Sequence, residues 1–111
     1  MVTEGKINLR IISSYTDEQA VDDGVLVDIA GFKLFLGQGP VNRITRNLYD
    51  ELKKYADHDR RKLRGILREK LSYAYMPQDN PQDGYLYLLP PNLWAIRNEL
   101  DGYTLMFPED Y

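Results

Sequence analysis

The sequence predicts an α+β fold: one domain over residues 1–111, with an antiparallel sheet of three to five strands and two or three helices packed on one face. Three observations favour this fold. A chain of 111 residues that is 43% hydrophobic has the size and composition of one globular domain. Its middle carries amphipathic helical patterns, and its last third carries short apolar runs around turn residues. Helices that cover one face of an antiparallel sheet define the α+β class.

The first third of the chain is predicted to hold one short helix between extended segments. Ile7–Ile12 is expected to be a strand or an extended arm. Thr16 followed by Gln19 forms a capping-box pattern, which predicts a helix over residues 17–22 that Gly24 ends. Two short apolar runs follow and are predicted strands: Val25–Val27 and Phe32–Leu36.

Two longer amphipathic helices are predicted in the middle of the chain. Thr45 is the expected N-cap of a helix that runs to about Asp57, and Asp59 is the expected N-cap of the next. The short loop between them leaves open an antiparallel pair or one bent helix. Apolar side chains at helical spacing predict one buried face on each. These faces are Leu48, Leu52 and Ala56 in the first helix and Leu63, Ile66, Leu67 and Leu71 in the second.

The last third is predicted to form antiparallel strands. Asp101-Gly102 is a strong signal for a two-residue hairpin turn. If Leu100 lies opposite Tyr103, apolar side chains of both strands share one face, which supports that register. Tyr85–Leu89 supplies a third strand, whose two tyrosines either pack within the sheet or form an exposed aromatic strip. The same register places Asn98 opposite Leu105 and Ile96 opposite Phe107.

Composition excludes several classes of site and partner. The chain has no cysteine, which removes disulfides, zinc–thiolate sites and cysteine nucleophiles. His58 is the only histidine, and its neighbours Asp57 and Asp59 diverge from it on most backbones, so we expect no metal centre there. The net charge of −3 argues against broad, unspecific nucleic-acid binding. Without a signal-peptide pattern or an apolar stretch of about 20 residues, we expect a cytoplasmic protein with no membrane partner.

Two further patterns resemble catalytic or ligand motifs without completing one. Gly37–Pro40 lacks the lysine and hydroxyl of a phosphate-binding loop and is expected to be a plain turn. Asp22, Asp23 and Asp28 do not follow the spacing of a calcium-binding loop and are expected to be a solvated helix end. We therefore expect no enzyme activity, no metal and no cofactor. A small enzyme with a carboxylate site is a third hypothesis, which a deep pocket lined by Asp23, Asp28 or Glu99 would favour.

Four segments of the chain resemble a known family. Ser14–Asp28 (SYTDEQAVDDGVLVD) is close to that family's opening, SYTxxQAxxDGVLVD, and the similarity recurs at Gly31-Phe32, at Val41–Arg46 and at Gly102–Tyr111. The chain is thus similar to a family of small uncharacterised proteins that bacteria, plasmids, conjugative elements and phages carry. It departs at Asp17, where family members often have arginine. The resemblance implies a mobile-element protein, and small acidic proteins of such elements often bind host proteins.

The function expected from this context is binding without catalysis. We expect an accessory protein of a mobile genetic element, a phage or a plasmid, that binds and inhibits or modulates a host protein, for example a defence system such as a CRISPR effector. Its acidic side chains would mimic nucleic acid in a basic groove of that partner. The predicted partner-binding residues are Asp17, Glu18, Asp22, Asp23, Asp79, Asp83, Glu109 and Asp110.

The alternative hypothesis is a nucleic-acid-binding regulator. Residues 51–75 carry 8 basic and 4 acidic side chains, whereas residues 76–111 carry 1 and 6. In the predicted helix over residues 60–70, arginines recur at positions i, i+4 and i+8 and therefore line one face. This face either pairs with the protein's own acidic parts or docks on an anionic partner. The candidate anion-binding residues are Arg60, Arg61, Arg64 and Arg68.

Overall fold

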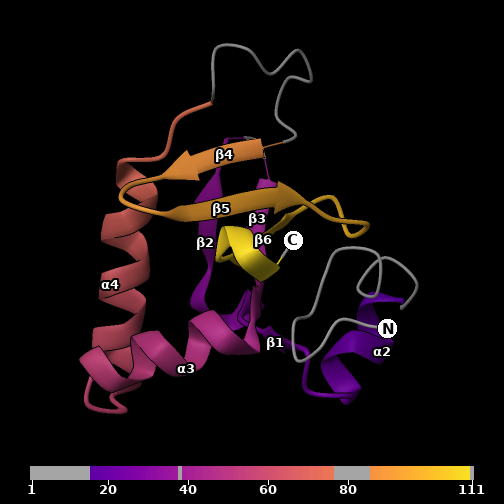
Figure 1. Cartoon of the computed structure of the whole chain (residues 1–111), viewed down its shortest axis with the longest axis horizontal. Coiled ribbons are helices and arrows are strands. Elements are labelled where there is room, and N and C mark those ends of the chain that lie inside the picture. The colour runs from indigo at the N-terminus through magenta and orange to yellow at the C-terminus, as the bar shows by residue number, and fades with distance from the viewer. Residues whose placement is uncertain (1–15, 38, 77–85, 111) are drawn as a thin grey trace.

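The computed structural model describes residues 16–37, 39–76 and 86–110, which confirm the α+β class (Figure 1). Within these ranges six strands form one sheet. Their order is β1-β3-β6-β5-β4, and β2 also pairs with β3. The strands are β1 (Leu26–Asp28), β2 (Leu34–Leu36), β3 (Gly39–Thr45), β4 (Leu86–Leu89), β5 (Leu93–Arg97) and β6 (Tyr103–Met106).

The predicted capping box begins the helix α2 (Asp17–Asp22). The Thr16 hydroxyl accepts a hydrogen bond from Gln19 N at 3.1 Å, and Gln19 Oε1 accepts one from Thr16 N at 3.1 Å. Two backbone donors that the first helical turn leaves free are satisfied in this way. Gly24 follows with a φ of 79°, so it ends the helix as predicted.

The two longer helices also begin at their predicted caps. α3 (Arg46–Tyr55) follows Thr45, and α4 (Arg60–Ser72) follows Asp59, whose carboxylate accepts hydrogen bonds from the first turn. Asp57 and His58 both have a positive φ, so the chain turns sharply between the helices. Figure 1 shows two separate helices that run in clearly different directions, rather than an antiparallel pair or one bent helix.

One hydrophobic core joins these two helices to the sheet. The apolar stripes predicted on α3 and α4 are buried, apart from a half-buried Ile66. They pack with Val41, Ala95 and Leu105 from three strands. Ala20 of α2 is buried but lies outside this cluster, and α2 lies beside β1 (Figure 1). Helices therefore cover only part of the sheet.

The sheet is mixed, which corrects the predicted antiparallel arrangement and strand number. β3 pairs with β6 in parallel, with Val41 opposite Tyr103 and Ile44 opposite Leu105. Between these strands the chain passes through α3, α4, β4 and β5, a connection long enough to return it to the same end of the sheet. The remaining strand pairs are antiparallel. β4 and β5 run across the direction of β2 and β3 in Figure 1, so the sheet is strongly twisted.

The hairpin between β5 and β6 forms in a different register from the predicted one. Arg97, not Leu100, lies opposite Tyr103, and Ala95 lies opposite Leu105. This shift by three residues exchanges the two faces of β5. Ala95 therefore faces the core, while Trp94 and Ile96 share the other face with Thr104 and Met106.

The side chain of Asn98 explains this register. Its Oδ1 accepts hydrogen bonds from Leu100 N at 3.0 Å and from Gly102 N at 3.1 Å, which closes a loop longer than two residues. Its Nδ2 donates to Asn42 Oδ1 at 2.7 Å and to Thr104 Oγ1 at 3.1 Å. An asparagine that satisfies the backbone of its own loop overrides the local Asp-Gly turn signal.

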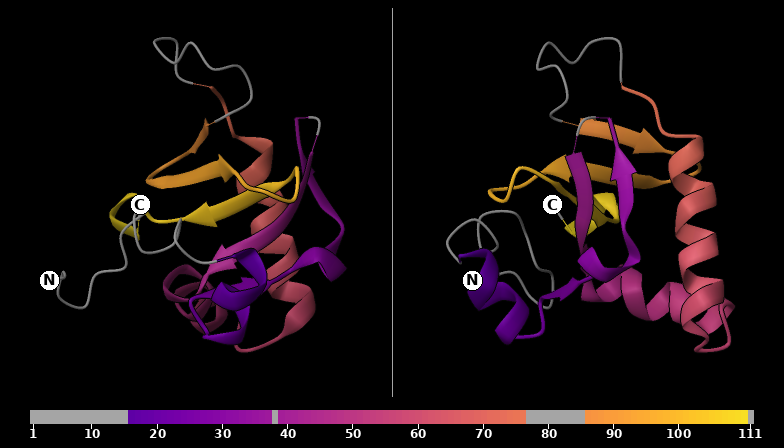
Figure 2. Two further views of the ribbon diagram at one scale, coloured as in Figure 1. Left: turned by 90° about the vertical axis from the view of Figure 1, so that its right-hand side faces the viewer. Right: turned by 180° about the vertical axis from the view of Figure 1, so that it is seen from behind.

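A break in the edge strand shapes the side of the sheet next to α4. β1 and β2 both pair with β3, and the short 3₁₀ helix η1 (Ala30–Phe32) lies between them. The predicted strand over Phe32–Leu36 is therefore shorter, because Phe32 turns into the core and Lys33 takes a left-handed φ of 57°. Figure 2 shows this part of the sheet beside α4, and β2 is the strand that contacts the helix.

The two tyrosines of the predicted third strand were expected to pack within the sheet or to form an exposed aromatic strip, and the structure describes one of them. Tyr87 is half-buried and packs edge-on against Tyr103, with ring centroids 5.5 Å apart, so it belongs to the packed sheet. Tyr85 lies outside the described residues, as does the predicted strand or arm over Ile7–Ile12. Among the helices that the structure describes, none combines the length and the apolar character that crossing a bilayer requires.

Candidate nucleic-acid interface

A shallow groove runs along the seam between α4 and β2. It has a volume of about 370 Å³. We call it the basic groove, because its lining includes three cations and no carboxylate. β2 and the residue before it form one wall, and α4 forms the other. The lining residues are Lys33, Leu34, Phe35, Arg64, Arg68, Leu71 and Ser72.

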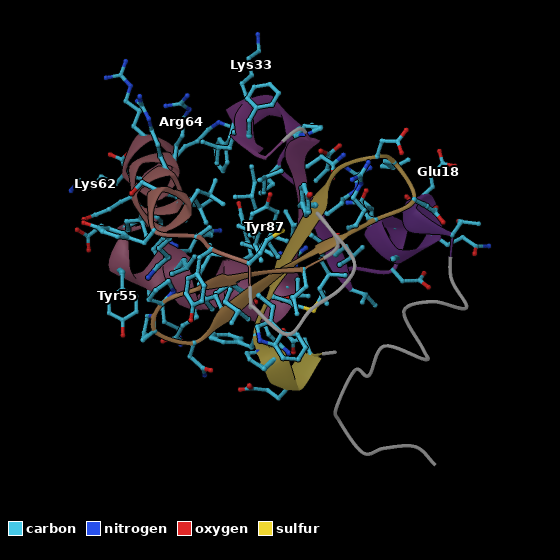
Figure 3. All side chains as sticks on the ribbon, turned by 90° about the horizontal axis from the view of Figure 1, so that it is seen from above. Glu18, Lys33, Tyr55, Lys62, Arg64 and Tyr87 are labelled. Atoms are coloured by element: carbon cyan, nitrogen blue, oxygen red, sulfur yellow. The ribbon has the colours of Figure 1, made fainter. Side chains whose placement is uncertain are left out.

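Helical spacing brings the arginines of α4 to this wall. Residues four apart on an α-helix are rotated by about 40°, so Arg60, Arg64 and Arg68 form a row that drifts slowly around α4. α4 spans all three, and the predicted alignment on one face is confirmed. The row borders the buried stripe of the helix and therefore lies close to the sheet edge. Figure 3 shows Arg64 and Lys33 on the same side of the molecule.

Two of these arginines hold η1 against α4. Arg64 Nε donates a hydrogen bond to the carbonyl oxygen of Phe32 at 2.8 Å. The Arg60 guanidinium lies over the Phe32 ring, 4.4 Å from its centroid, in a cation–π contact. Gly31 permits this approach, since a Cβ there would lie 3.1 Å from Arg60 Nη2. These two side chains therefore stabilise the fold as well as adding charge.

The cations of the basic groove form no ion pair within the described part of the chain. Lys62, on the same helix, pairs with Asp57 at 3.6 Å. No ion pair between described residues involves the three cations that line the groove, and none involves Arg60 or Arg61 at the start of α4. The reading that this face pairs with the protein's own acids gains no support from the described residues. An anion in the groove would meet several cations at once.

An aromatic side chain stands in the same groove. Leu34 and Leu36 point into the core, and strand alternation therefore turns Phe35 outward, where 67% of it is exposed. Sequence reasoning missed both Phe35 and Lys33 as site residues. All but one of the residues of Phe32–Leu36 are apolar, so the sequence predicts a strand there but does not show which of its side chains face solvent.

The predicted acidic partner-binding residues differ in their exposure to solvent. Glu18, Asp22 and Asp23 are exposed on or next to α2, and Glu109 is exposed on the 3₁₀ helix η2 (Pro108–Asp110). No ion pair between described residues involves these four side chains. Three further predicted positions lie outside the described residues or side chains: Asp17, Asp79 and Asp83.

Asp110 is buried, so it does not belong to an exposed acidic surface, while its role in partner binding stays a prediction. It is 3% exposed, and its carboxylate accepts hydrogen bonds from Thr45 Oγ1 at 2.8 Å and from Asn47 Nδ2 at 2.9 Å. Phe107 N donates a third at 3.3 Å. A carboxylate held by three donors anchors the C-terminal segment to the start of α3.

The other motifs have local structural roles. Asp28 pairs with Arg43 at 3.1 Å and accepts a hydrogen bond from Ala30 N, so it is engaged within the edge strand. His58 is exposed in the turn between α3 and α4, and Gly37, with a φ of 59°, lies in the turn between β2 and β3. Among the described residues, no group of three or more histidine or acidic side chains is placed to hold a metal ion.

A second groove, with a volume of about 520 Å³, lies on the other flank of α4. The lining of this groove is mainly apolar and includes Tyr55, which is 73% exposed. Neither of these two grooves is lined by Asp23, Asp28 or Glu99, the carboxylates whose presence in a deep pocket would favour the enzyme hypothesis. The lining residues of this apolar groove are Leu48, Glu51, Leu52, Tyr55, Ile66, Lys70, Pro91, Asn92, Leu93 and Phe107.

Comparisons of the chain with protein-family models, with curated proteins and with solved structures found no match. The resemblance to proteins of mobile elements therefore rests on the sequence segments alone. The chemistry of the basic groove has to be argued from its own residues.

The double role of Arg64 leads to a stability prediction. Replacing it by alanine leaves the Phe32 carbonyl without its charged donor, so Arg64→Ala is expected to lower the free energy of unfolding by about 1–2 kcal/mol. Arg68→Ala is the matched control, because Arg68 lines the same groove on an exposed position and should change it by less than about 0.5 kcal/mol. Urea unfolding followed by circular dichroism measures both. Equal stability of the two variants would show that the hydrogen bond does not hold η1.

Proposed function

We propose that the protein binds nucleic acid through the basic groove. The observation that supports this most directly is the set of cations around one concave surface, with no acidic partner among the described residues. Phosphate backbones bind such surfaces by displacing condensed counterions, which needs several cations close together rather than a basic protein overall. A net charge of −3 is compatible with nucleic-acid binding at this groove. The excess of acidic residues elsewhere restricts the contact to the cationic face.

The distribution of charge also orients an anionic polymer. Figure 3 places Glu18 and Lys62 on opposite sides of the molecule, so the acidic end around α2 lies away from α4. Repulsion at the acidic end and attraction at α4 favour one approach direction. As a nucleic-acid-binding regulator, the protein would act in the cytoplasm of a bacterial host.

Removing two arginines without a described structural role tests this proposal. Arg61 and Arg68 are seven residues apart and so lie on nearly the same face of α4. In fluorescence anisotropy with labelled DNA and RNA strands, we expect the Arg61→Ala/Arg68→Ala variant to raise Kd by about tenfold or more at low salt. The slope of log Kd against log salt should fall by about 1.4, or about 0.7 per lost phosphate contact on a single strand.

The control for this measurement removes the same charge elsewhere. Lys53→Ala/Lys54→Ala also removes two cations, but from α3, and it should change Kd and the salt slope much less. If the wild-type protein binds no strand at low salt, or if both double variants weaken binding equally, the basic groove is not a nucleic-acid site.

A second candidate function is docking of the acidic end on a host protein. Three carboxylates, those of Glu18, Asp22 and Asp23, are exposed together at α2 and form no ion pair with a described residue. They could occupy a basic groove of a partner such as a defence nuclease, and so inhibit it, as expected for an accessory protein of a phage or plasmid. Such binding would weaken as salt rises, because the contact is electrostatic.

Charge reversal tests this second candidate. Asp22→Lys/Asp23→Lys is expected to abolish retention of a host protein in a pull-down from nuclease-treated bacterial lysate, while the fold is kept. The matched control, Asp50→Lys/Glu51→Lys, makes the same charge change on α3 and should retain the partner. Unchanged retention by the α2 variant would exclude the acidic end as the docking surface.

A further inference from the structure

We infer that the basic groove takes single-stranded nucleic acid and that Phe35 stacks on one of its bases. This inference rests on the proposed function and adds the class of ligand to it. A groove that bound only phosphates would need only cations. This groove also exposes the aromatic ring of Phe35, and an aromatic ring does not attract a phosphate anion.

The backbone of β2 determines that the Phe35 side chain points away from the core. Its neighbours Leu34 and Leu36 are buried, at 4% and 7% exposure, so both anchor β2 in the core. In the antiparallel pairing of β2 with β3, Phe35 lies opposite Pro40. The backbone of β2 therefore directs the Phe35 side chain outward, and a base could stack on it without a rearrangement of the strand.

The ring and the cations are placed for the two parts of a nucleotide. Phe35 and Lys33 stand on the β2 wall, and Arg64 and Arg68 stand on the α4 wall. A base stacked on the ring would have its sugar–phosphate within the same groove as these cations. The groove volume of about 370 Å³ is in the range of sites that hold small molecules of nucleotide size. An aromatic platform beside a cationic track is the usual arrangement for binding strands without sequence preference.

A duplex does not offer this contact. Its bases are stacked on each other inside the helix, and a protein must extrude one before a ring can stack on it. Single strands expose their bases at no such cost. The groove should therefore prefer a single strand to a duplex, and the preference should depend on Phe35.

The test separates stacking from charge by comparing two strands of equal charge. One is an oligothymidylate of about ten nucleotides, a length typical of single-strand sites, and the other is an abasic sugar–phosphate strand of the same length. Measured by anisotropy, the wild-type protein should bind the oligothymidylate about tenfold more tightly. Phe35→Leu keeps an apolar side chain on β2 but removes the ring, so it should bind both strands with the weaker affinity.

Two controls make the result specific. Phe35→Trp should restore the preference, because it restores an aromatic face. Tyr55→Leu removes a ring of similar exposure from the apolar groove and should leave the preference unchanged.

Three results would overturn the inference while leaving salt-dependent binding in place: equal affinity of the wild-type protein for both strands, tighter binding of a duplex, or an unchanged preference in Phe35→Leu. A Phe35→Leu variant that differs from the wild type in sedimentation coefficient would also overturn it, since the ring would then join two copies of the chain. Absence of binding to any strand, charged abasic strand included, would overturn the proposed function together with the inference.

Discussion

The hydrogen bond from Arg64 to the Phe32 carbonyl is the contact on which the arrangement of this surface depends. It joins α4 to the one place where the edge strand is broken, and the Arg60 guanidinium covers the Phe32 ring from the same helix. Phe32 is buried, so its carbonyl would otherwise lack a donor near an apolar core. Together with the shared hydrophobic core, this hydrogen bond holds α4 beside η1 and β2, and the seam between α4 and β2 is the basic groove.

The four arginines of α4 divide into two that stabilise the fold and two that are available to a ligand. Arg60 and Arg64 are tied to η1, whereas Arg61 and Arg68 have no partner among the described residues. Like charges at helical spacing cost a few tenths of a kcal/mol per pair, a cost that contacts with Phe32 offset for two of the four arginines. The acidic residues of α2 lie at the other end of the molecule and do not compensate this charge.

Local sequence signals predicted the helices correctly. The strand pairing and the hairpin register also depend on contacts between distant residues, which the sequence pattern does not show. A capping side chain acts within three residues, so Thr16, Thr45 and Asp59 could be read from the sequence. The parallel pairing of β3 with β6 depends on a connection through four elements, and no local pattern encodes it. The predicted hairpin register is wrong because Asn98 bonds to the backbone of its own loop and also to Asn42, 56 residues away, and only the first of these contacts is local. The arginines of α4 were found from their spacing, but the opposite wall of the groove depends on where β2 begins after η1.

The central claim is that the basic groove binds nucleic acid. The most direct test is to map, by NMR, which residues of the protein contact a bound strand. ¹H–¹⁵N spectra of the labelled protein would be recorded as an unlabelled oligothymidylate is added at low salt. The largest chemical-shift changes are expected at Lys33–Phe35 and along the arginine face of α4. Largest changes in α2, in the apolar groove, or nowhere in the described residues would contradict the account.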